Sequence, residues 1–168
     1  MQIETPHFYL RPLKESDATE TYLSWFADTA TQRYIVSASE NHTLENLRTY
    51  ITEKLSNDRV LFLGIFARED MRHIGNIKFE PIDSEAGYAI MGILIGDPEY
   101  RGKGVASAVI KASASWLKTH RKINKLLLGV HVDNLAAIRA YENIGFVMGT
   151  TEFLKPETPD TLVMIWQL

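Results

Sequence analysis

The sequence predicts an α/β fold built on a mixed β-sheet, and three features of its pattern lead to that prediction. Strand-like runs follow one another at 60–67, 73–82 and 87–96, each bounded by turn residues. An alanine-rich run with apolar residues at helical spacing begins near residue 105. The run 125–132 is almost wholly apolar, which is typical of a strand covered on both faces. Because strands and helices alternate only in part, the pattern does not fit a regular βαβ chain.

Two helices are expected between the first strand and these runs. Residues 7–13 form the first predicted strand. Asp17 and Glu20 have the spacing of a capping box and predict the start of a helix. Thr43 can cap a second helix, which carries an apolar stripe and ends near Leu55.

The second half of the chain predicts one further helix and two closing strands. The polar turn 68–72 suits a hairpin between the first two strand runs. Residues 134–144 have a helical pattern, and Gly145 stands where a helix C-terminal stop belongs. The segments 145–154 and 161–168 are the closing strands. The expected order is therefore β-α-α-β-β-β-α-β-α-β-β.

Composition indicates one compact domain spanning 1–168, with 45% hydrophobic and 23% charged residues. There is no cysteine, which excludes disulfides, thiolate metal sites and a cysteine nucleophile and fits a reducing compartment. The formal charge of -3 disfavours general binding of nucleic acid. With neither a signal-like N-terminus nor a run long enough to span a membrane, the expected location is the cytoplasm, and no membrane or metal is expected as a partner.

Residues 101–106, RGKGVA, lie between a predicted strand and a long helix. A helix N-terminus carries unpaired N–H groups and a positive partial charge, both of which favour a phosphate. Gly102 and Gly104 lack a β-carbon, so an anion can approach the backbone closely. Arg101 and Lys103 add positive charge. The segment therefore predicts a phosphate or pyrophosphate site, and the alternative is a glycine turn that merely starts a helix.

Two familiar phosphate motifs do not fit this segment. A Walker A loop needs four residues between its first glycine and the Gly-Lys pair, followed by Ser or Thr. Here five residues separate Gly96 from Gly102, and Lys103 is followed by Gly104. A dinucleotide fingerprint would need a glycine at Ser107 and belongs near the first strand.

RGKGVA instead resembles the (R/Q)xxGx(G/A) loop of the GNAT superfamily of acyl-CoA-dependent N-acyltransferases. Residues 134–146, NLAAIRAYENIGF, resemble the second signature of that family, NxxAxxxYxxxGF. The two motifs stand in the family's order, and the resemblance covers essentially the whole chain. It implies a mixed, mostly antiparallel central sheet of about seven strands flanked by about four helices. It also implies an N-acetyltransferase with acetyl-CoA as co-substrate.

The resemblance further implies how acetyl-CoA is held. The strand before the glycine loop is expected to splay from its neighbour, so that its free backbone groups pair with the pantetheine arm. The backbone of 102–107 would cradle the pyrophosphate, Asn134 would hydrogen-bond the pantetheine, and Ala137 would leave room beside it. The expected cofactor-binding residues are Leu94, Ile95, Gly96, Arg101, Gly102, Lys103, Gly104, Val105, Ala106, Ser107, Asn134, Ala137 and Tyr141.

The catalytic residues implied by the resemblance are less complete. Tyr141 falls where relatives often place a tyrosine near the sulfur of CoA, as a general acid on the leaving thiolate. Many relatives carry a carboxylate base on the strand before the loop, but the matching position here is Ile90. Glu80 and His131 are the nearest alternatives by strand position, and a chain of waters is a third. With neither cysteine nor a GxSxG serine, direct transfer through a ternary complex is expected.

The sequence determines the acceptor amine less closely than it determines the cofactor. The segment 22–35 resembles the branch with ribosomal-protein N-terminal and amino-sugar acetyltransferases, and 92–104 favours nucleotide-linked amino sugars slightly. Protein N-termini come next, polyamines and aminoglycosides remain open, and a homodimer is possible. A non-catalytic acyl-CoA-binding module is the alternative. The first two helices are expected on the acceptor side, where the aromatic residues are Tyr22, Trp25, Phe26, Tyr34 and His42.

Overall fold

The computed structural model describes residues 1–34 and 42–168. These residues form one eight-stranded sheet with the order β1-β2-β3-β4-β5-β6-β8-β7. Only β5 and β6 pair in parallel, and the other neighbours are antiparallel. The strands are β1 (Ile3–Glu4), β2 (Phe8–Pro12), β3 (Leu61–Ala67), β4 (His73–Asp83), β5 (Tyr88–Ile95), β6 (Lys125–His131), β7 (Val147–Met148) and β8 (Thr161–Gln167). The predicted mixed, mostly antiparallel sheet is confirmed.

Five α-helices accompany the sheet in the described part of the chain. They are α1 (Glu20–Ser24), α2 (Thr29–Tyr34), α3 (Leu44–Leu55), α4 (Val105–Arg121) and α5 (Leu135–Ile144). Short 3₁₀ turns join them at η1 (Glu15–Asp17), η2 (Trp25–Ala27) and η4 (Pro98–Tyr100). None of these helices has both the length and the apolar composition that crossing a membrane requires.

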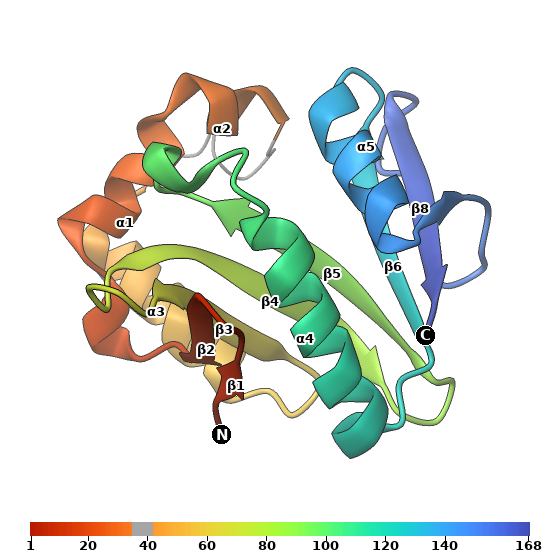
Figure 1. The fold of residues 1–168 in the computed structure, drawn as a ribbon, viewed down its shortest axis with the longest axis horizontal. Helices are drawn as coiled ribbons and strands as arrows, with labels where there is room; N and C mark the ends of the chain where they lie inside the picture. Colours follow the sequence, from red (N-terminus) through yellow and green to blue (C-terminus); the bar gives the residue numbers. More distant parts are fainter. Residues whose placement is uncertain (35–41) are drawn as a thin grey trace.

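Two separate cores hold the helices against the two faces of the sheet (Figure 1). On one face α4 and α5 bury residues such as Val109 and Ile138 against the central strands. On the other face Ile51 of α3 packs with Tyr22 and Trp25 from the segment before it. The sheet is thus covered on both sides, which explains why β3 is buried at every position.

Local capping signals fix several helix ends, and those at Thr43 and Gly145 are as predicted. The Thr43 hydroxyl accepts from the Asn46 N–H and starts α3, and the Asn134 side chain accepts from the Ala137 N–H and starts α5. Gly145 ends α5 with φ of 130°, a conformation that favours glycine.

The predicted capping box at Asp17 is wrong. Thr19 caps α1, through a hydrogen bond from the Tyr22 N–H. The Asp17 carboxylate is occupied elsewhere, since it accepts two hydrogen bonds from the Arg11 guanidinium and one from the Lys14 N–H. Burial would raise the pKa of Asp17, but these hydrogen bonds outweigh it and lower the pKa.

The structure differs from the sequence prediction in two further elements. The predicted strand 145–154 shortens to β7, because the chain leaves the sheet after Met148 and β7 has only β8 to pair with. The helix α2 was not anticipated: it has only six residues, too few for its pattern to stand out. The predicted acceptor-side segment 22–35 is described as far as Tyr34, and Ile35 lies outside the described residues.

His73, at the start of β4, is packed among aromatic rings. Its ring stacks on Phe66 at 4.8 Å and meets Tyr22 and Trp25 edge-on at 5.4 and 5.0 Å. Its Nε2 is buried and has no hydrogen-bond partner among the described residues. Burial lowers the pKa of His73 to about 4, so the folded protein keeps this imidazole neutral at pH values where an unfolded chain would protonate it.

This burial predicts a loss of stability on acidification. Between pH 6.5 and pH 4 the unfolded chain binds a proton that the folded protein does not, so the free energy of unfolding falls as the pH falls. From pH 7.5 to pH 5 the His73 contribution is about 2 kcal/mol. His73→Phe keeps a ring at this position and should reduce the pH dependence by about that amount, as measured by urea unfolding at both pH values. Equal pH dependence in parent and variant would contradict the assignment.

Candidate active site

The central feature of the site is the place where β5 and β6 separate. Their parallel pairing covers three residue pairs, from Tyr88 with Lys125 to Ile90 with Leu127. Beyond Ile90, β5 continues to Ile95 and remains paired only with β4, and β6 continues to His131, paired only with β8. Figure 1 shows the two strands diverging from that point. The expected splay is present, and we call the opening between the two strands the notch.

The strand edge along the notch offers unpaired backbone. Gly92 is exposed, and a side chain there would meet no atom within 4 Å. Leu94 and Ile95 are half-buried although they lie mid-sheet. The backbone groups of Gly96 already have partners, because its N–H donates to the Ile74 carbonyl and its carbonyl accepts from Arg101. The Ile95 carbonyl is also taken by Arg101, so a pseudo-strand in the notch is left with the other backbone groups of 92–95.

The glycine loop lies between η4 and α4 and is open on its outer side. Gly102 and Gly104 have φ of 71° and 75°, in the left-handed region that favours glycine. A β-carbon at either would meet no atom within 4 Å. Gly104 is the N-cap of α4 and has no side chain to cap it. The first-turn N–H groups of Val105, Ala106 and Ser107 therefore have no capping side chain and are available to an anion.

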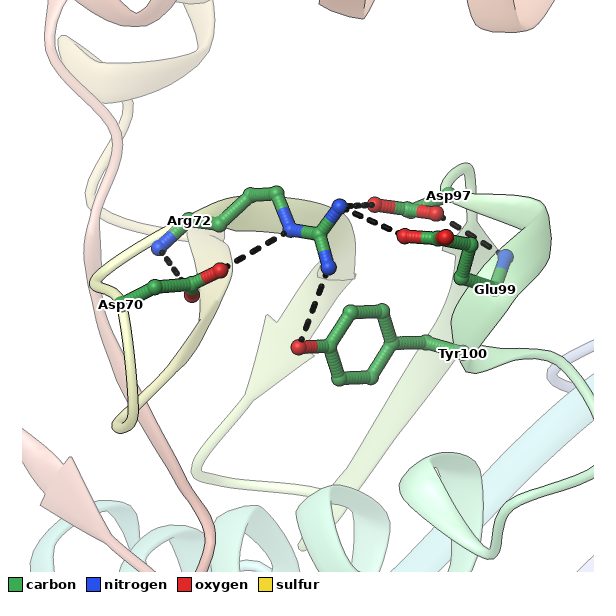
Figure 2. A network of polar contacts seen from close by, with 5 residues as sticks. All are labelled: Asp70, Arg72, Asp97, Glu99 and Tyr100. Carbon is green, nitrogen blue, oxygen red and sulfur yellow. Dashed lines mark hydrogen bonds and ion pairs between the residues drawn. The ribbon is translucent and has the colours of Figure 1, made fainter.

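The approach to this loop is fixed by Arg72, on the turn between β3 and β4 (Figure 2). Its guanidinium lies 2.7 Å from the Glu99 carboxylate and 3.3 Å from the Asp97 carboxylate, and it donates to the Tyr100 hydroxyl at 3.4 Å. An ion pair with Asp70 holds it from the other side. Hydrogen bonds to Tyr100 and Glu99 raise the pKa of Arg72. The network joins the hairpin turn to η4 and so sets the direction in which the chain enters the glycine loop.

Arg101, expected as a cofactor ligand, makes other contacts. Its Nε donates to the Ile95 carbonyl at 3.0 Å, and its Nη2 donates to the Gly96 carbonyl at 3.1 Å. Its Nη1 forms an ion pair with Asp28 at 3.0 Å. The guanidinium therefore holds the end of β5 and the start of α2. Lys103 lies over the Tyr100 ring at 5.7 Å.

The second motif places its residues on α5. The Asn134 side chain is occupied in part as the helix cap, its oxygen accepting from the Ala137 N–H at 3.3 Å. Ala137 and Tyr141 lie one turn apart and are both half-buried against the core shared with α4. The Tyr141 ring meets Phe146 edge-on at 5.8 Å.

Tyr141 remains a proton donor over the whole useful pH range. Burial raises its pKa to about 12, because the phenolate would be poorly solvated there. A thiol such as that of cysteine has a pKa near ~8.5. Tyr141 is therefore protonated at neutral pH and can donate a hydrogen bond to a developing thiolate, although complete proton transfer is uphill because the thiol is the stronger acid.

The position of the missing carboxylate is apolar, as the sequence indicated. Ile90 lies where the notch opens. Glu80 lies on the neighbouring strand, in the irregular stretch between the pairs Phe79–Met91 and Ile82–Ala89. Its carboxylate is held by Lys54 at 2.6 Å and Lys78 at 2.8 Å. Burial would raise the pKa of Glu80, but hydrogen bonds from the two lysines outweigh it and lower the pKa. A general base needs the opposite shift.

His131, the other candidate base, lies at the end of β6. Its Nδ1 accepts a hydrogen bond from the Asp133 N–H at 3.1 Å. The neutral ring therefore carries its proton on Nε2, which in this arrangement donates and cannot accept a proton from an amine. Neither Glu80 nor His131 is placed as a ready base.

The aromatic residues expected on the acceptor side separate into two groups. Tyr22 and Trp25 are buried in the second core, and Trp25 lies so close to Gly96 that a β-carbon there would fall 1.9 Å from its ring. The others are half-buried and form ring pairs. Phe26 stacks on His42 at 4.3 Å, and Tyr34 meets His131 at 5.8 Å.

Sequence reasoning missed Asp28 and Thr31, which connect α2 to Arg101. The Asp28 carboxylate caps α2 through the Thr31 N–H at 3.0 Å and also accepts from the Thr31 hydroxyl. The local spacing of Asp28 before a short polar run was a capping signal. Its second role could not be found there, because Arg101 is distant in sequence.

With this geometry in view, the chain belongs to the acetyltransferase (GNAT) domain family, whose family model matches residues 7–147. Acetyl-CoA is the acetyl donor of that family. The chain is 32% identical over 93 residues to N-alpha-acetyltransferase 30 of Schizosaccharomyces pombe, an alignment covering 55% of this chain and 53% of that protein. The curated relatives are longer than the matched stretch, which covers 32% and 53% of the first two.

Solved structures share the fold over nearly the whole chain. One is an acetyltransferase from Salmonella typhimurium that modifies the N-terminal serine of ribosomal protein L7/L12, with a TM-score of 0.82, 16% identity, and coverage of 100% of this chain and 99% of that one. Another is the spermidine N-acetyltransferase of Vibrio cholerae in complex with CoA and spermine, with a TM-score of 0.81, 21% identity, and coverage of 97% and 96%. At these identities the likeness concerns the fold alone.

The open glycine loop leads to a prediction about cofactor binding. Acetyl-CoA should raise the Tm of the parent, because a ligand bound only by the folded state stabilises it. Gly104→Val places a branched side chain beside the first-turn N–H groups at a positive φ, and it should abolish that rise. The measurement is a thermal melt with and without acetyl-CoA.

Gly87→Val is the matched control for this variant. Gly87 has the same φ of 75° but lies in the turn between β4 and β5, at the paired end of β5. It should lower the Tm through comparable backbone strain and through crowding of the Asn124 side chain, 3.0 Å from the added β-carbon, and keep the rise on adding acetyl-CoA. A Gly104→Val protein that binds acetyl-CoA as tightly as the parent would show that the loop is not the phosphate site.

Proposed function

We propose that this domain transfers the acetyl group of acetyl-CoA directly to a primary amine. The observation that carries the proposal is the notch between β5 and β6, with the open glycine loop at the end of β5 and Tyr141 on the helix that follows β6. In this arrangement the pantetheine arm pairs with β5 at Leu94 and Ile95. Its pyrophosphate lies on the backbone of 102–107, and its thioester reaches toward α5.

The reaction on these groups is a single displacement. The lone pair of the neutral amine attacks the thioester carbonyl, the C–N bond forms and the C–S bond breaks. The sulfur leaves with the bonding electrons and takes a hydrogen bond, then a proton, from the Tyr141 hydroxyl, and water returns a proton to Tyr141. The excess proton of the amine goes to water. The chain has no cysteine to carry an acetyl intermediate.

Water is the proton acceptor that fits this site best. The Glu80 carboxylate is paired with two lysines, which favour its charged, weakly basic state. The His131 Nδ1 is occupied by the Asp133 N–H. With Ile90 at the position of the missing carboxylate, the amine enters as the neutral species or loses its proton to solvent in the notch.

An acceptor that carries an acidic group fits better than a polycation. On the face of the sheet that α3 covers, the charges of Lys54, Lys78 and Glu80 add up to one positive charge. Lys78 also pairs across the sheet with Gly92, which lies beside the notch. The Lys78 Nζ also donates to the Tyr50 hydroxyl at 2.7 Å. This charge favours a nucleotide-linked amino sugar or another amino sugar, and then a protein N-terminus, over spermidine.

The alternative function is a non-catalytic module that binds acyl-CoA. The apolar Ile90 at the closed end of the notch favours it, because such a module needs no base. The half-buried hydroxyl of Tyr141 supports the enzyme, since a sensor has no use for an acid there. We also place the protein in the cytoplasm, in line with its lack of cysteine, and leave its assembly as a dimer to measurement.

A panel of amines tests the proposed function. The purified domain is mixed with acetyl-CoA and, separately, an amino sugar, a nucleotide-linked amino sugar, a short peptide with a free N-terminus, and spermidine. Thiol release should require an amine and be fastest with the nucleotide-linked amino sugar, which carries the acidic phosphate groups. Without an amine, mass spectrometry should find no acetylated protein. Binding of acetyl-CoA with no turnover of any amine would favour the non-catalytic module, and a burst of CoA with acetyl left on the chain would exclude direct transfer.

Tyr141→Phe tests the general acid. The variant keeps the ring and its contact with Phe146, so acetyl-CoA affinity should change little. Loss of the acid should lower kcat by about 10²–10⁴-fold, with kcat/KM falling in parallel. In the parent, kcat should not decline up to pH 10, because the Tyr141 pKa of about 12 keeps the phenol protonated. A variant within about threefold of the parent, with chemistry limiting, would reduce Tyr141 to a packing residue.

A further inference from the structure

The short helix α2 is held at both of its ends to the two strands that form the notch. At its start, Asp28 and Thr31 contact the Arg101 guanidinium, which also binds the last carbonyls of β5. At its end, Tyr34 meets His131, the last residue of β6. Figure 1 shows α2 on the side of the molecule where β5 ends. Helix α2 therefore spans the open mouth of the notch.

All three nitrogens of the Arg101 guanidinium have partners in this position. Nε and Nη2 donate to the carbonyls of Ile95 and Gly96, and Nη1 pairs with Asp28. The Asp28 carboxylate is itself shared, since it accepts from the Thr31 N–H and hydroxyl. Burial would raise the pKa of Asp28, but hydrogen bonds from Thr31 and the charge of Arg101 lower it. Turning this guanidinium toward a phosphate on the loop would break some of these contacts.

Helix α2 depends on such anchors. With six residues it is too short to be stable by itself. It buries one side chain, Thr31, which is 4% exposed and lies 3.5 Å from the Arg101 Nη2. The ion pair of Asp28 with Arg101 and the contact of Arg101 with the Thr31 hydroxyl tie the start of this helix to the end of β5.

We propose that Arg101 is a positioning residue for the amine acceptor: it fixes α2 across the mouth of the notch and leaves the pyrophosphate to the loop backbone. The inference rests on the proposed function, because it takes the notch as the meeting place of thioester and amine. In that case the arginine that precedes the glycine loop in the first motif serves the acceptor side of the site and not the cofactor.

Two conservative variants and their double test this role. Arg101→Lys keeps the positive charge, which still suits a phosphate, but lacks the planar fork by which the guanidinium reaches β5 and Asp28 together. Asp28→Asn removes the charge partner of Arg101 and keeps a good N-cap for α2. Each single variant should raise the KM for the amine about tenfold, the effect of roughly 1.4 kcal/mol, with the Kd for acetyl-CoA within twofold of the parent. The double variant should be no worse than either single one, because both break one contact.

A second measurement does not need activity. Hydrogen exchange of the α2 amides should speed up about tenfold in both single variants, since the helix loses its anchor, while exchange in α4 stays as in the parent. Weaker acetyl-CoA binding in Arg101→Lys, with Asp28→Asn unchanged in amine KM and in exchange, would make Arg101 a phosphate ligand and overturn the proposal. If no amine is turned over, the proposed function is wrong. The exchange measurement still tests the role of Arg101: faster exchange in α2 supports it, and unchanged exchange contradicts it.

Discussion

β5 and β6 are held together through three residue pairs, and every other part of the site depends on where that pairing stops. A longer ladder would close the sheet and leave no edge for an amide-bearing arm. Because each strand keeps its partner on the outer side, β4 for β5 and β8 for β6, the notch opens without loss of either strand. The helices that follow the two strands, α4 and α5, start at its two margins and direct their N-terminal ends toward the same opening.

The parts of the fold that sequence could predict are those set by local chemistry. Strand runs, the caps at Thr43 and Asn134, and the stop at Gly145 each depend on residues within one turn of one another. The glycines of the loop were predicted to leave its backbone open, and a β-carbon at Gly102 or Gly104 would meet no atom within 4 Å. The splay itself came only from family resemblance, because nothing local in β5 distinguishes a strand that leaves its neighbour.

The parts that sequence could not predict depend on partners distant in the chain. Asp17 carries a capping signal, but the Arg11 guanidinium takes its carboxylate. Glu80 is a plausible base by strand position, and its low pKa arises from Lys54 on α3 as well as from Lys78. The electrostatic character of a carboxylate is a property of its surroundings and not of its position in a motif.

The glycine loop illustrates how an open anion site can still be well ordered. A β-carbon at Gly102 or Gly104 would meet no atom within 4 Å, so the outer side of the loop is open at both glycines. The loop is fixed at its two ends. Arg72 and Arg101 bind the segment before it from opposite sides, one toward the β3–β4 turn and the other toward α2. Val105 and Val109, 2% and 0% exposed, anchor α4 after it. A loop that is ordered by its ends keeps its N–H groups free for a ligand. Because these groups are already ordered in the unliganded protein, binding loses less conformational entropy.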